Sequence, residues 1–205
     1  TTTGPLGQGL GNAVGMALAE RLLNARLGDQ VVDHYTYVIA GDGCLMEGIS
    51  SEAASLAGHL KLDNLCWIYD NNHITIEGNT RIAFTEDVAA RFLGYQWNVL
   101  RVGDANDLER IEHALTVFRE TKRRPTLIVL DTHIGWGSPH RQDTPAAHGE
   151  PLGVEEVKLT KRAYGWPEDA QFLVPDGVRE HFQARMGARG KGLREAWEKT
   201  LGGYK

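Results

Sequence analysis

The chain has 205 residues, 41% of them hydrophobic and 24% charged, a composition typical of one folded domain with a sizeable core. Its formal net charge of −5 argues against general nucleic-acid binding, because phosphate backbones attract basic surfaces. No apolar run approaches the about 20 residues that span a bilayer, and the start resembles neither a signal nor a transit peptide. Cys44 and Cys66 form no disulfide scaffold or metal motif and indicate a reducing compartment. We therefore expect a cytoplasmic protein that binds neither nucleic acid nor membrane.

The chain begins with a glycine-rich helical pattern. Small and apolar residues at helical spacing predict a helix over residues 7–27, and a run of β-formers predicts a buried strand over 35–40. The glycines of that helix cost about 1 kcal/mol each relative to alanine, which close backbone packing or a nearby ligand would explain. Helical spacing returns over residues 45–60, and a second buried strand is expected over 65–69. A hairpin-like segment follows over residues 74–77.

The middle of the chain continues to alternate between helix and strand. The pattern predicts a helix over residues 86–94, a strand over 98–102, a helix over 107–121 and an apolar strand over 126–130. Such alternation predicts an α/β fold, with a parallel sheet that has helices on both faces. Ligands bind these sheets beyond the carboxyl ends of the strands, where the motifs described below fall.

Residues 131–151 are expected to form a loop, because Gly, Pro, Ser and His cluster there. A connection of this length is usually functional. Further helices are predicted over residues 154–164, 176–186 and 193–201. We expect the core of one domain over residues 1–153 and a C-terminal helical part of the same domain over residues 154–205. Because the sequence lacks an initiator Met and opens on a glycine-rich turn, it resembles a piece of a longer chain.

The strongest chemical signal is a pair of motifs at the ends of two predicted strands. Gly41-Asp42-Gly43 follows the first strand, and Asn71-Asn72 follows the second, thirty positions later. Mg²⁺ prefers oxygen ligands and is usually held by one or two protein groups together with substrate phosphates. Asp42 offers a charged oxygen, Asn72 an amide oxygen and Ile74 a backbone carbonyl. Gly-Asp-Gly alone also suits a strand-to-helix turn with a capping aspartate, but its combination with Asn-Asn favours a metal site.

The glycines beside Asp42 favour a phosphate at the same place. Gly41 and Gly43 let the backbone approach a phosphate closely and point N–H groups at it. The helix predicted to begin near Leu45 adds its positive end. The sequence therefore predicts a divalent cation beneath a diphosphate.

These motifs resemble the metal–diphosphate fingerprint of thiamine-diphosphate enzymes. The stretch from Gly41 to Glu52 is similar to transketolases in particular. Three other stretches share this similarity: Thr2-Thr3-Gly4-Pro5-Leu6-Gly7-Gln8-Gly9, Ile134-Gly135-Trp136-Gly137-Ser138 and His148-Gly149-Glu150-Pro151-Leu152-Gly153. The resemblance covers nearly the whole chain. Sister families share the first fingerprint but neither Gly-Pro-Leu-Gly-Gln-Gly nor Met-Glu-Gly-Ile-Ser.

The resemblance implies a role for each matching residue. Asp42, Asn72 and the carbonyl of Ile74 would bind Mg²⁺ or Ca²⁺. The residues implied to contact thiamine diphosphate are these three and Gly4, Pro5, Leu6, Gly43, Glu47, Ile76, Ile134 and His148. Apolar walls suit such a site, because a carbanion must survive there without protonation by bulk water.

The implied catalytic residues are His148, Glu47 and Glu52. His148 would lie between the diphosphate and the reacting carbon, where an imidazole donates hydrogen bonds and relays protons. Glu47 and Glu52 would lie near a subunit interface and link the two active sites of a dimer, although acids in the first turns of a helix also favour its dipole. His133 and His140 have no such support, and we expect them to be structural or surface groups.

The implied reaction moves a two-carbon ketol unit from a ketose phosphate to an aldose phosphate. The family's N-terminal histidines, and the pyrimidine-binding residues that a homodimer partner or pyrimidine-binding domain contributes, do not occur in this sequence. We therefore expect the chain alone to bind cofactor weakly and not to turn over. Pro145 stands where the family often has a histidine, and the loop is slightly longer than usual, which affects the substrate side. Two alternatives stay open: a related ketol transferase such as dihydroxyacetone synthase, and a non-catalytic cofactor-binding or assembly module.

Overall fold

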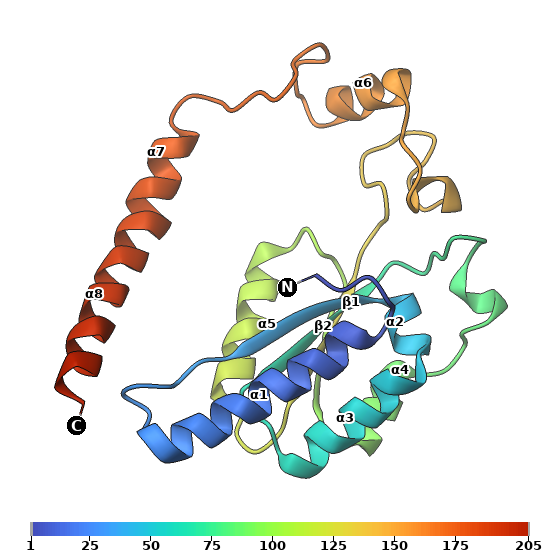
Figure 1. Ribbon diagram of the computed structural model, residues 1–205. Helices are drawn as coiled ribbons and strands as arrows, with labels where there is room; N and C mark the ends of the chain where they lie inside the picture. Colours follow the sequence, from blue (N-terminus) through green and yellow to red (C-terminus); the bar gives the residue numbers. More distant parts are fainter. Residues whose placement is uncertain (1, 205) are drawn as a thin grey trace.

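Residues 2–204, which the computed structural model describes, form a parallel sheet with helices on both faces and a helical segment that extends from it (Figure 1). The strands are β1 (Thr36–Gly41), β2 (Leu65–Asn71), β3 (Asn98–Val102) and β4 (Thr126–Asp131). Within the described residues their order in the sheet is β1-β2-β4-β3, and each neighbouring pair is parallel. The predicted α/β fold and its strands are therefore confirmed.

Helices pack on each face of the sheet. In chain order, the helices up to residue 163 are α1 (Gln8–Leu27), α2 (Asp42–Met46), α3 (Gly48–Leu60), α4 (Val88–Gly94), α5 (Leu108–Glu120) and α6 (Val154–Ala163), with 3₁₀ turns at Thr80–Ile82 and Pro145–Ala147. α6 lies apart from the sheet and contacts the loop after β4 through Glu156 (Figure 1). Residues of α1, α3 and α4 are buried against one face, and residues of α5 against the other. Between residues 2 and 204, none of the helices combines the length and the hydrophobicity that crossing a bilayer requires.

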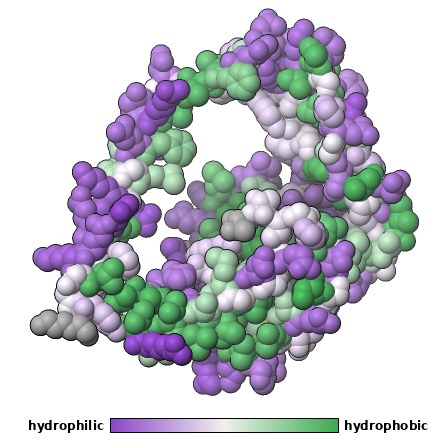
Figure 2. Space-filling view, in the orientation of Figure 1, coloured by the Kyte–Doolittle hydropathy of each residue, from purple (hydrophilic) through white to green (hydrophobic). Residues whose placement is uncertain are grey.

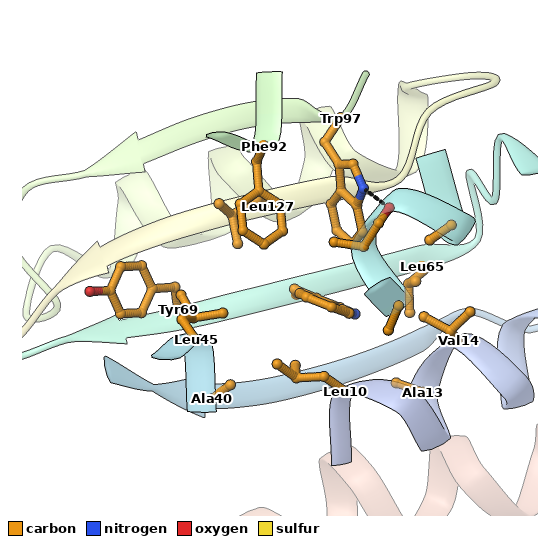
Figure 3. Packing of buried hydrophobic residues seen from close by; sticks show 14 of the residues in the cluster. Leu10, Ala13, Val14, Ala40, Leu45, Leu65, Tyr69, Phe92, Trp97 and Leu127 are labelled. Atoms are coloured by element: carbon orange, nitrogen blue, oxygen red, sulfur yellow. Dashed lines mark hydrogen bonds between the residues drawn. The ribbon is translucent and has the colours of Figure 1, made fainter. Parts of the chain in front are cut away.

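The larger part of the core lies under α1, α3 and α4 (Figure 3). Alternate residues of β2 point to opposite faces, so Trp67 and Tyr69 are buried here while Cys66 is buried on the other face. The ring centroids of Trp67 and Trp97 are 4.8 Å apart, and the Trp97 indole donates a 2.8 Å hydrogen bond to the carbonyl oxygen of Ala54 in α3. This packing fixes where the strands end, and so where the loops beyond them begin.

The single helix predicted over residues 45–60 is wrong, because the chain forms two helices there. α2 and α3 are separated at Glu47, whose backbone is extended (φ −73°, ψ 138°). The Ser50 hydroxyl donates a 2.7 Å hydrogen bond to the Glu47 carbonyl oxygen, and Arg91 donates one of 3.1 Å to the Leu45 carbonyl oxygen. The Arg91 bond gives the Leu45 carbonyl a partner at the end of α2, and the Ser50 hydroxyl adds to the hydrogen bond that the Ser50 backbone N–H donates to Glu47 at the start of α3.

The prediction that the first strand is buried holds for only one of its faces. Ala40 is buried on the face beneath α1, but Tyr37 and Ile39 are 47% and 73% exposed. β1 lies at one edge of the sheet, and α5 packs mainly beside β3 at the opposite edge, although the ring centroid of Phe118 in α5 lies 5.3 Å from that of Tyr37. In the described residues, the second face of β1 is therefore left largely uncovered.

The helices predicted over residues 176–186 and 193–201 join into one continuous segment. Its parts are α7 (Val178–Phe182), a π-helical turn (Gln183–Gly187) and α8 (Ala188–Gly203). We call residues 178–203 the arm. The Trp197 indole of the arm donates a 2.9 Å hydrogen bond to the carbonyl oxygen of Val31, just beyond α1. Figure 2 shows an open space between the rest of the arm and the body of the molecule.

Candidate functional site

The carboxyl ends of β1 and β2 border a cavity of about 350 Å³. Asp42 follows β1 as the first residue of α2, and Asn72 follows β2, so the parallel pairing of these strands brings both residues to one edge of the sheet. The predicted site residues that line the cavity are Leu6, Asp42, Gly43, Asn72, Ile74, Ile76 and His148. The cavity thus lies where the strand ends were expected to place a ligand.

Asp42 is buried, with only 3% of its surface exposed. The Tyr69 hydroxyl donates a 2.5 Å hydrogen bond to Oδ1 of Asp42, whereas Oδ2 is buried and has no hydrogen-bond partner among the described residues. Burial raises the pKa of Asp42 above its ordinary value, while the Tyr69 hydrogen bond and the nearby His73 oppose that rise. A cation beside Oδ2 would compensate the cost of burying this charge.

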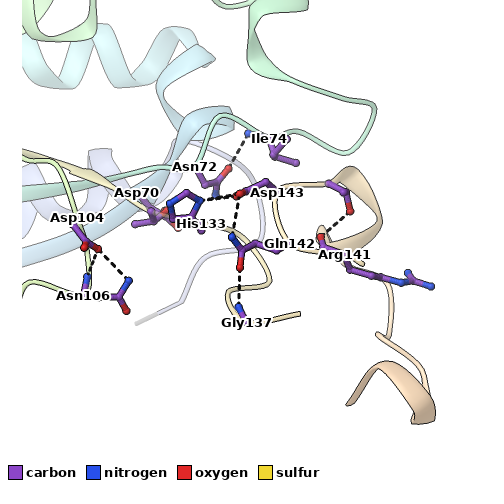
Figure 4. A network of polar contacts seen from close by, with 12 residues as sticks. Asp70, Asn72, Ile74, Asp104, Asn106, His133, Gly137, Arg141, Gln142 and Asp143 are labelled. Atoms are coloured by element: carbon purple, nitrogen blue, oxygen red, sulfur yellow. Dashed lines mark hydrogen bonds and ion pairs between the residues drawn. The ribbon is translucent and has the colours of Figure 1, made fainter. Parts of the chain in front are cut away.

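Asn72 and Ile74 bring neutral oxygen atoms to the same cavity. The Ile74 backbone N–H donates a 2.9 Å hydrogen bond to Oδ1 of Asn72, which closes an Asx turn (Figure 4). His73, in the middle of this turn, has a left-handed backbone (φ 62°). Ile74 also pairs with Asn79 in an antiparallel bridge, which confirms the hairpin-like segment. The amide oxygen of Asn72 keeps a second lone pair for another partner.

These donors suit a hard cation that shares its coordination with an anion. The Asp42 carboxylate, the Asn72 amide and the Ile74 carbonyl offer one charged and two neutral oxygens, the ligand types that Mg²⁺ and Ca²⁺ take. Between residues 2 and 204, no cluster of three or more His, Cys, Asp or Glu side chains is placed to hold a metal. A cation held here would therefore need further oxygen ligands, such as those of a phosphate.

The N-terminal stretch reaches the cavity through a tight turn at Gly7. Gly7 has a left-handed φ of 76°, and a Cβ atom there would lie 2.7 Å from Cγ2 of Ile49 and 2.9 Å from Cβ of Glu47. Leu6 lines the cavity, where a Cβ atom on Gly43 would lie 3.2 Å from its Cδ1 atom. Close backbone packing therefore accounts for glycine at these two positions.

His148 reaches the cavity from the long loop after β4. It follows the 3₁₀ turn Pro145–Ala147, and its backbone N–H donates a 2.8 Å hydrogen bond to the carbonyl oxygen of Pro145. The side chain is exposed. The base of the loop is closed by a 3.0 Å hydrogen bond from the Asp143 backbone N–H to the Ile134 carbonyl oxygen. These contacts give the loop a defined path that ends at the cavity.

His133 and His140 pair with carboxylates and do not line the cavity. Nδ1 of His133 lies 2.9 Å from Oδ2 of Asp143 (Figure 4), and Nδ1 of His140 lies 2.8 Å from Oε2 of Glu156 in α6. The Ser138 hydroxyl donates a 2.5 Å hydrogen bond to Glu156. This bond, together with the hydrogen bonds from His140, lowers the pKa of Glu156 to about 2. Both histidines therefore make structural contacts, as expected.

The remaining predicted residues lie outside the cavity lining. They are Gly4, Pro5, Glu47, Glu52 and Ile134. Glu47 is the N-cap residue of α3, and Glu52 is exposed on the same helix. Ile134 is half-buried at the start of the loop. The structure does not bring these side chains to the cavity, and their roles stay predictions.

Several lining residues were not singled out by the sequence. These are Cys44, Met46, Thr75 and Glu77. Cys44 and Met46 belong to α2, which begins at Asp42 and not near Leu45 as predicted. A prediction that the helix begins directly after the strand would have placed Cys44 and Met46 at the same edge of the sheet as Asp42. Thr75 and Glu77 lie in the predicted hairpin-like segment, whose proximity to Asn72 was the available signal.

The fold and the cavity together define a class of protein, namely an α/β domain that binds a ligand at the carboxyl edge of a parallel sheet. The sequence matches the family described as "Transketolase, thiamine diphosphate binding domain" over residues 1–205. This chain belongs to that family.

Individual relatives agree with the family. The transketolase of Geobacillus stearothermophilus is 50% identical over 206 residues, covering 99% of this chain and 31% of the relative, and that of Bacillus subtilis is 50% identical over 207 residues, covering 100% and 31%. The structure of transketolase from Leishmania mexicana aligns with a TM-score of 0.95 at 43% identity, covering 100% of this chain and 31% of that one. A Pichia stipitis transketolase structure described as a complex with xylulose 5-phosphate aligns with a TM-score of 0.95 at 43% identity, covering 100% and 30%. The chain thus spans about a third of the length of the relatives that it matches.

Proposed function

We propose that this chain supplies the diphosphate- and metal-binding half of a transketolase active site, which transfers a two-carbon ketol unit between ketose and aldose phosphates. The observation that carries the proposal is the buried Oδ2 atom of Asp42, for which residues 2–204 offer no hydrogen-bond donor, in a residue whose cavity Asn72 and Ile74 also line. The family match favours this function over a non-catalytic module, and the relatives' names favour it over dihydroxyacetone synthase.

The metal ligands in this proposal are Asp42, Asn72 and the backbone carbonyl of Ile74. Mg²⁺ or Ca²⁺ would neutralise the buried Asp42 carboxylate and bind phosphate oxygens on its other side. The ion would thereby reverse the electrostatic penalty that now raises the pKa of Asp42. The metal is therefore proposed to tie the cofactor's diphosphate to the carboxyl edge of the sheet.

The diphosphate would lie against the backbone on either side of Asp42. Among the described residues other than its chain neighbours, nothing lies within 4 Å of the place where a Cβ atom on Gly41 would be, and a Cβ atom on Gly43 would meet the side chain of Leu6. Backbone N–H groups that lack neighbouring side chains can donate hydrogen bonds to phosphate oxygens. We therefore assign Gly43 to the diphosphate, with Gly41 leaving room for it.

The rest of the proposed site provides apolar side chains and the imidazole ring of His148. Leu6 and Ile76 line it and are 53% and 70% exposed, which suits packing on the rings of a bound cofactor. Thiamine diphosphate, when bound, supplies the carbon nucleophile that breaks and forms the carbon–carbon bond. His148 would donate a hydrogen bond to bound substrate or diphosphate and move a proton there.

The other half of the site would come from a homodimer partner or a pyrimidine-binding domain. The matched relatives are about three times as long as this chain, which leaves room for such parts. Glu47 and Glu52 are exposed near the junction of α2 and α3, where a partner subunit could contact them. The substrates would be sugar phosphates, of the kind named for the Pichia stipitis structures with xylulose 5-phosphate and sedoheptulose 7-phosphate.

Calorimetric titration of the intact protein with thiamine diphosphate, with and without Mg²⁺, tests this proposal. We expect Mg²⁺ to tighten cofactor binding at least about tenfold, because the Asp42 carboxylate would hold the ion, which would in turn attract the anionic diphosphate. Asp42→Asn removes the charge of the metal-binding side chain. In this variant Mg²⁺ should no longer increase the affinity for the cofactor, and ketol transfer from xylulose 5-phosphate should be lost.

Asp29→Asn is the matched control, because Asp29 is exposed in the turn after α1. This variant should keep the metal-dependent gain and the activity. Cofactor binding that does not depend on Mg²⁺, or that survives in Asp42→Asn, would show that the proposed metal site is wrong.

A further inference from the structure

Tyr69 contacts the proposed metal site but is not itself among the proposed site residues. It is 4% exposed, its ring belongs to the core cluster under α1 and α3, and its hydroxyl donates a 2.5 Å hydrogen bond to Oδ1 of Asp42. Figure 3 shows this hydroxyl pointing toward the carboxyl ends of the strands, away from Trp97. The ring therefore packs in the hydrophobic core, whereas the hydroxyl faces the carboxyl ends of the strands.

The parallel pairing of β1 and β2 explains the contact. Tyr69 pairs with Ala40 in the register of the two strands, and Asp42 comes two residues after Ala40. The tyrosine side chain points to the same face as Trp67, and its hydroxyl reaches the carboxylate of Asp42 just beyond the end of β1. The position of the hydroxyl is thus set by the rigid sheet and not by a loop.

The contact with Tyr69 gives the two carboxylate oxygens of Asp42 different surroundings. The terminal torsion of an aspartate has a broad energy minimum, so an unrestrained carboxylate turns easily. The Tyr69 hydrogen bond fixes Oδ1, whereas Oδ2 is buried and has no hydrogen-bond partner in the part of the chain that the structure describes. Groups that hydrogen-bond to a metal-ligating side chain, and so orient it, commonly determine the affinity for the metal.

We propose that Tyr69 is a positioning residue, which holds the Asp42 carboxylate so that Oδ2 is presented to the divalent cation of the site. This inference rests on the proposed function. It assigns the hydroxyl, and not the ring, to metal binding, because the ring packs in the core whether or not a cation is bound. Tyr69→Phe therefore separates the two contributions, since it removes the hydroxyl and keeps the ring.

The test measures Mg²⁺ binding to the intact protein at saturating thiamine diphosphate. In Tyr69→Phe the dissociation constant for Mg²⁺ should rise about tenfold to hundredfold, the usual effect of losing a group that orients a metal ligand. At saturating Mg²⁺ the KM for the ketose phosphate should stay unchanged, whereas general loosening of the core would raise both constants. Circular dichroism of the metal-free variant, recorded below its unfolding midpoint, establishes that the variant is folded.

Tyr95→Phe is the matched control, because its ring packs against Phe92 in the same core while its hydroxyl is outside the cavity lining. It should leave Mg²⁺ affinity unchanged.

The outcomes separate this inference from the function on which it rests. Wild-type protein that binds no Mg²⁺ with the cofactor overturns both. Wild-type protein that binds Mg²⁺ while Tyr69→Phe binds it equally well overturns only the role of Tyr69. The same holds if Tyr95→Phe weakens Mg²⁺ binding as strongly as Tyr69→Phe does.

Discussion

At Gly7 the addition of a single methyl group tests how the N-terminal turn shapes the cavity. Gly7→Ala would place a Cβ atom 2.7 Å from Cγ2 of Ile49 and force a side chain onto a left-handed backbone. We expect a loss of about 1–3 kcal/mol in the free energy of unfolding, the range for an overpacked position. Cofactor affinity should also fall, because Leu6 would move away from the cavity. Thermal unfolding and calorimetric titration measure the two effects.

Gly15→Ala provides the control in the same helix. Nothing lies within 4 Å of the position that its Cβ atom would take, and alanine favours an exposed helix over glycine by up to about 1 kcal/mol. This variant should be as stable as the wild type or more stable, with unchanged cofactor affinity. Equal losses at Gly7 and Gly15 would contradict the assigned role of the turn.

Single residues were predictable where a motif marks them and not where packing places them. Asp42 and Asn72 stand in short glycine- and asparagine-rich stretches after apolar runs, so their meeting at one cavity follows from parallel strand order. Tyr69 is only the last residue of an apolar run in the sequence. Its contact with Asp42 depends on the register of β1 with β2, which no local pattern encodes.

Among the secondary-structure elements, the strands were predictable and one helix boundary was not. A buried parallel strand leaves a continuous run of β-formers, which is visible without any neighbour. The break at Glu47 leaves no such trace, because Leu45 and Ile49 keep helical spacing across it. The break is stabilised by hydrogen bonds from Ser50 and Arg91. Arg91 belongs to α4, so its part in the break depends on the tertiary fold.

The contact between the long loop and α6 should weaken at low pH. Glu156 accepts hydrogen bonds from Ser138 and from His140, and these lower its pKa from an ordinary 4.5 to about 2. A lowered folded-state pKa means that the contact's full contribution is present above about pH 4.5 and is lost as the pH falls through about 2. Glu156→Gln should therefore speed amide hydrogen exchange of Gly137, Ser138 and His140 at pH 6, and the ratio of variant to wild-type rates should approach one near pH 2.

Comparing rates as a ratio at each pH removes the intrinsic pH dependence of hydrogen exchange. Glu155→Gln is the neighbouring control, because the Glu155 carboxylate lies 3.4 Å from the Lys158 amine and is exposed. Its ratio should stay near one throughout. A Glu156→Gln ratio that does not change between pH 6 and pH 2 would show that this carboxylate does not hold the loop.

At the scale of the whole molecule, the sequence predicted which elements form but not what covers them. The apolar run of β1 suggested a strand buried on both faces, yet Tyr37 and Ile39 are exposed because β1 lies at the edge of the sheet. The arm was predicted as two helices because its glycines were taken as breaks. Its residues are exposed, so tertiary packing contributes little to its path.

The arm should therefore respond to helix propensity independently of the sheet. Gly190 and Gly192 lie inside α8 with nothing within 4 Å of their Cβ positions, so replacing both by alanine should stabilise the arm by about 1 kcal/mol per residue. Gly177, at the N-cap of α7, has a φ of 81°, and alanine there should cost about 1–2 kcal/mol. Hydrogen exchange should slow in the first variant and quicken in the second, within the arm alone. Equal changes in β2 and β4 would instead mean that the arm and the sheet unfold as one cooperative unit.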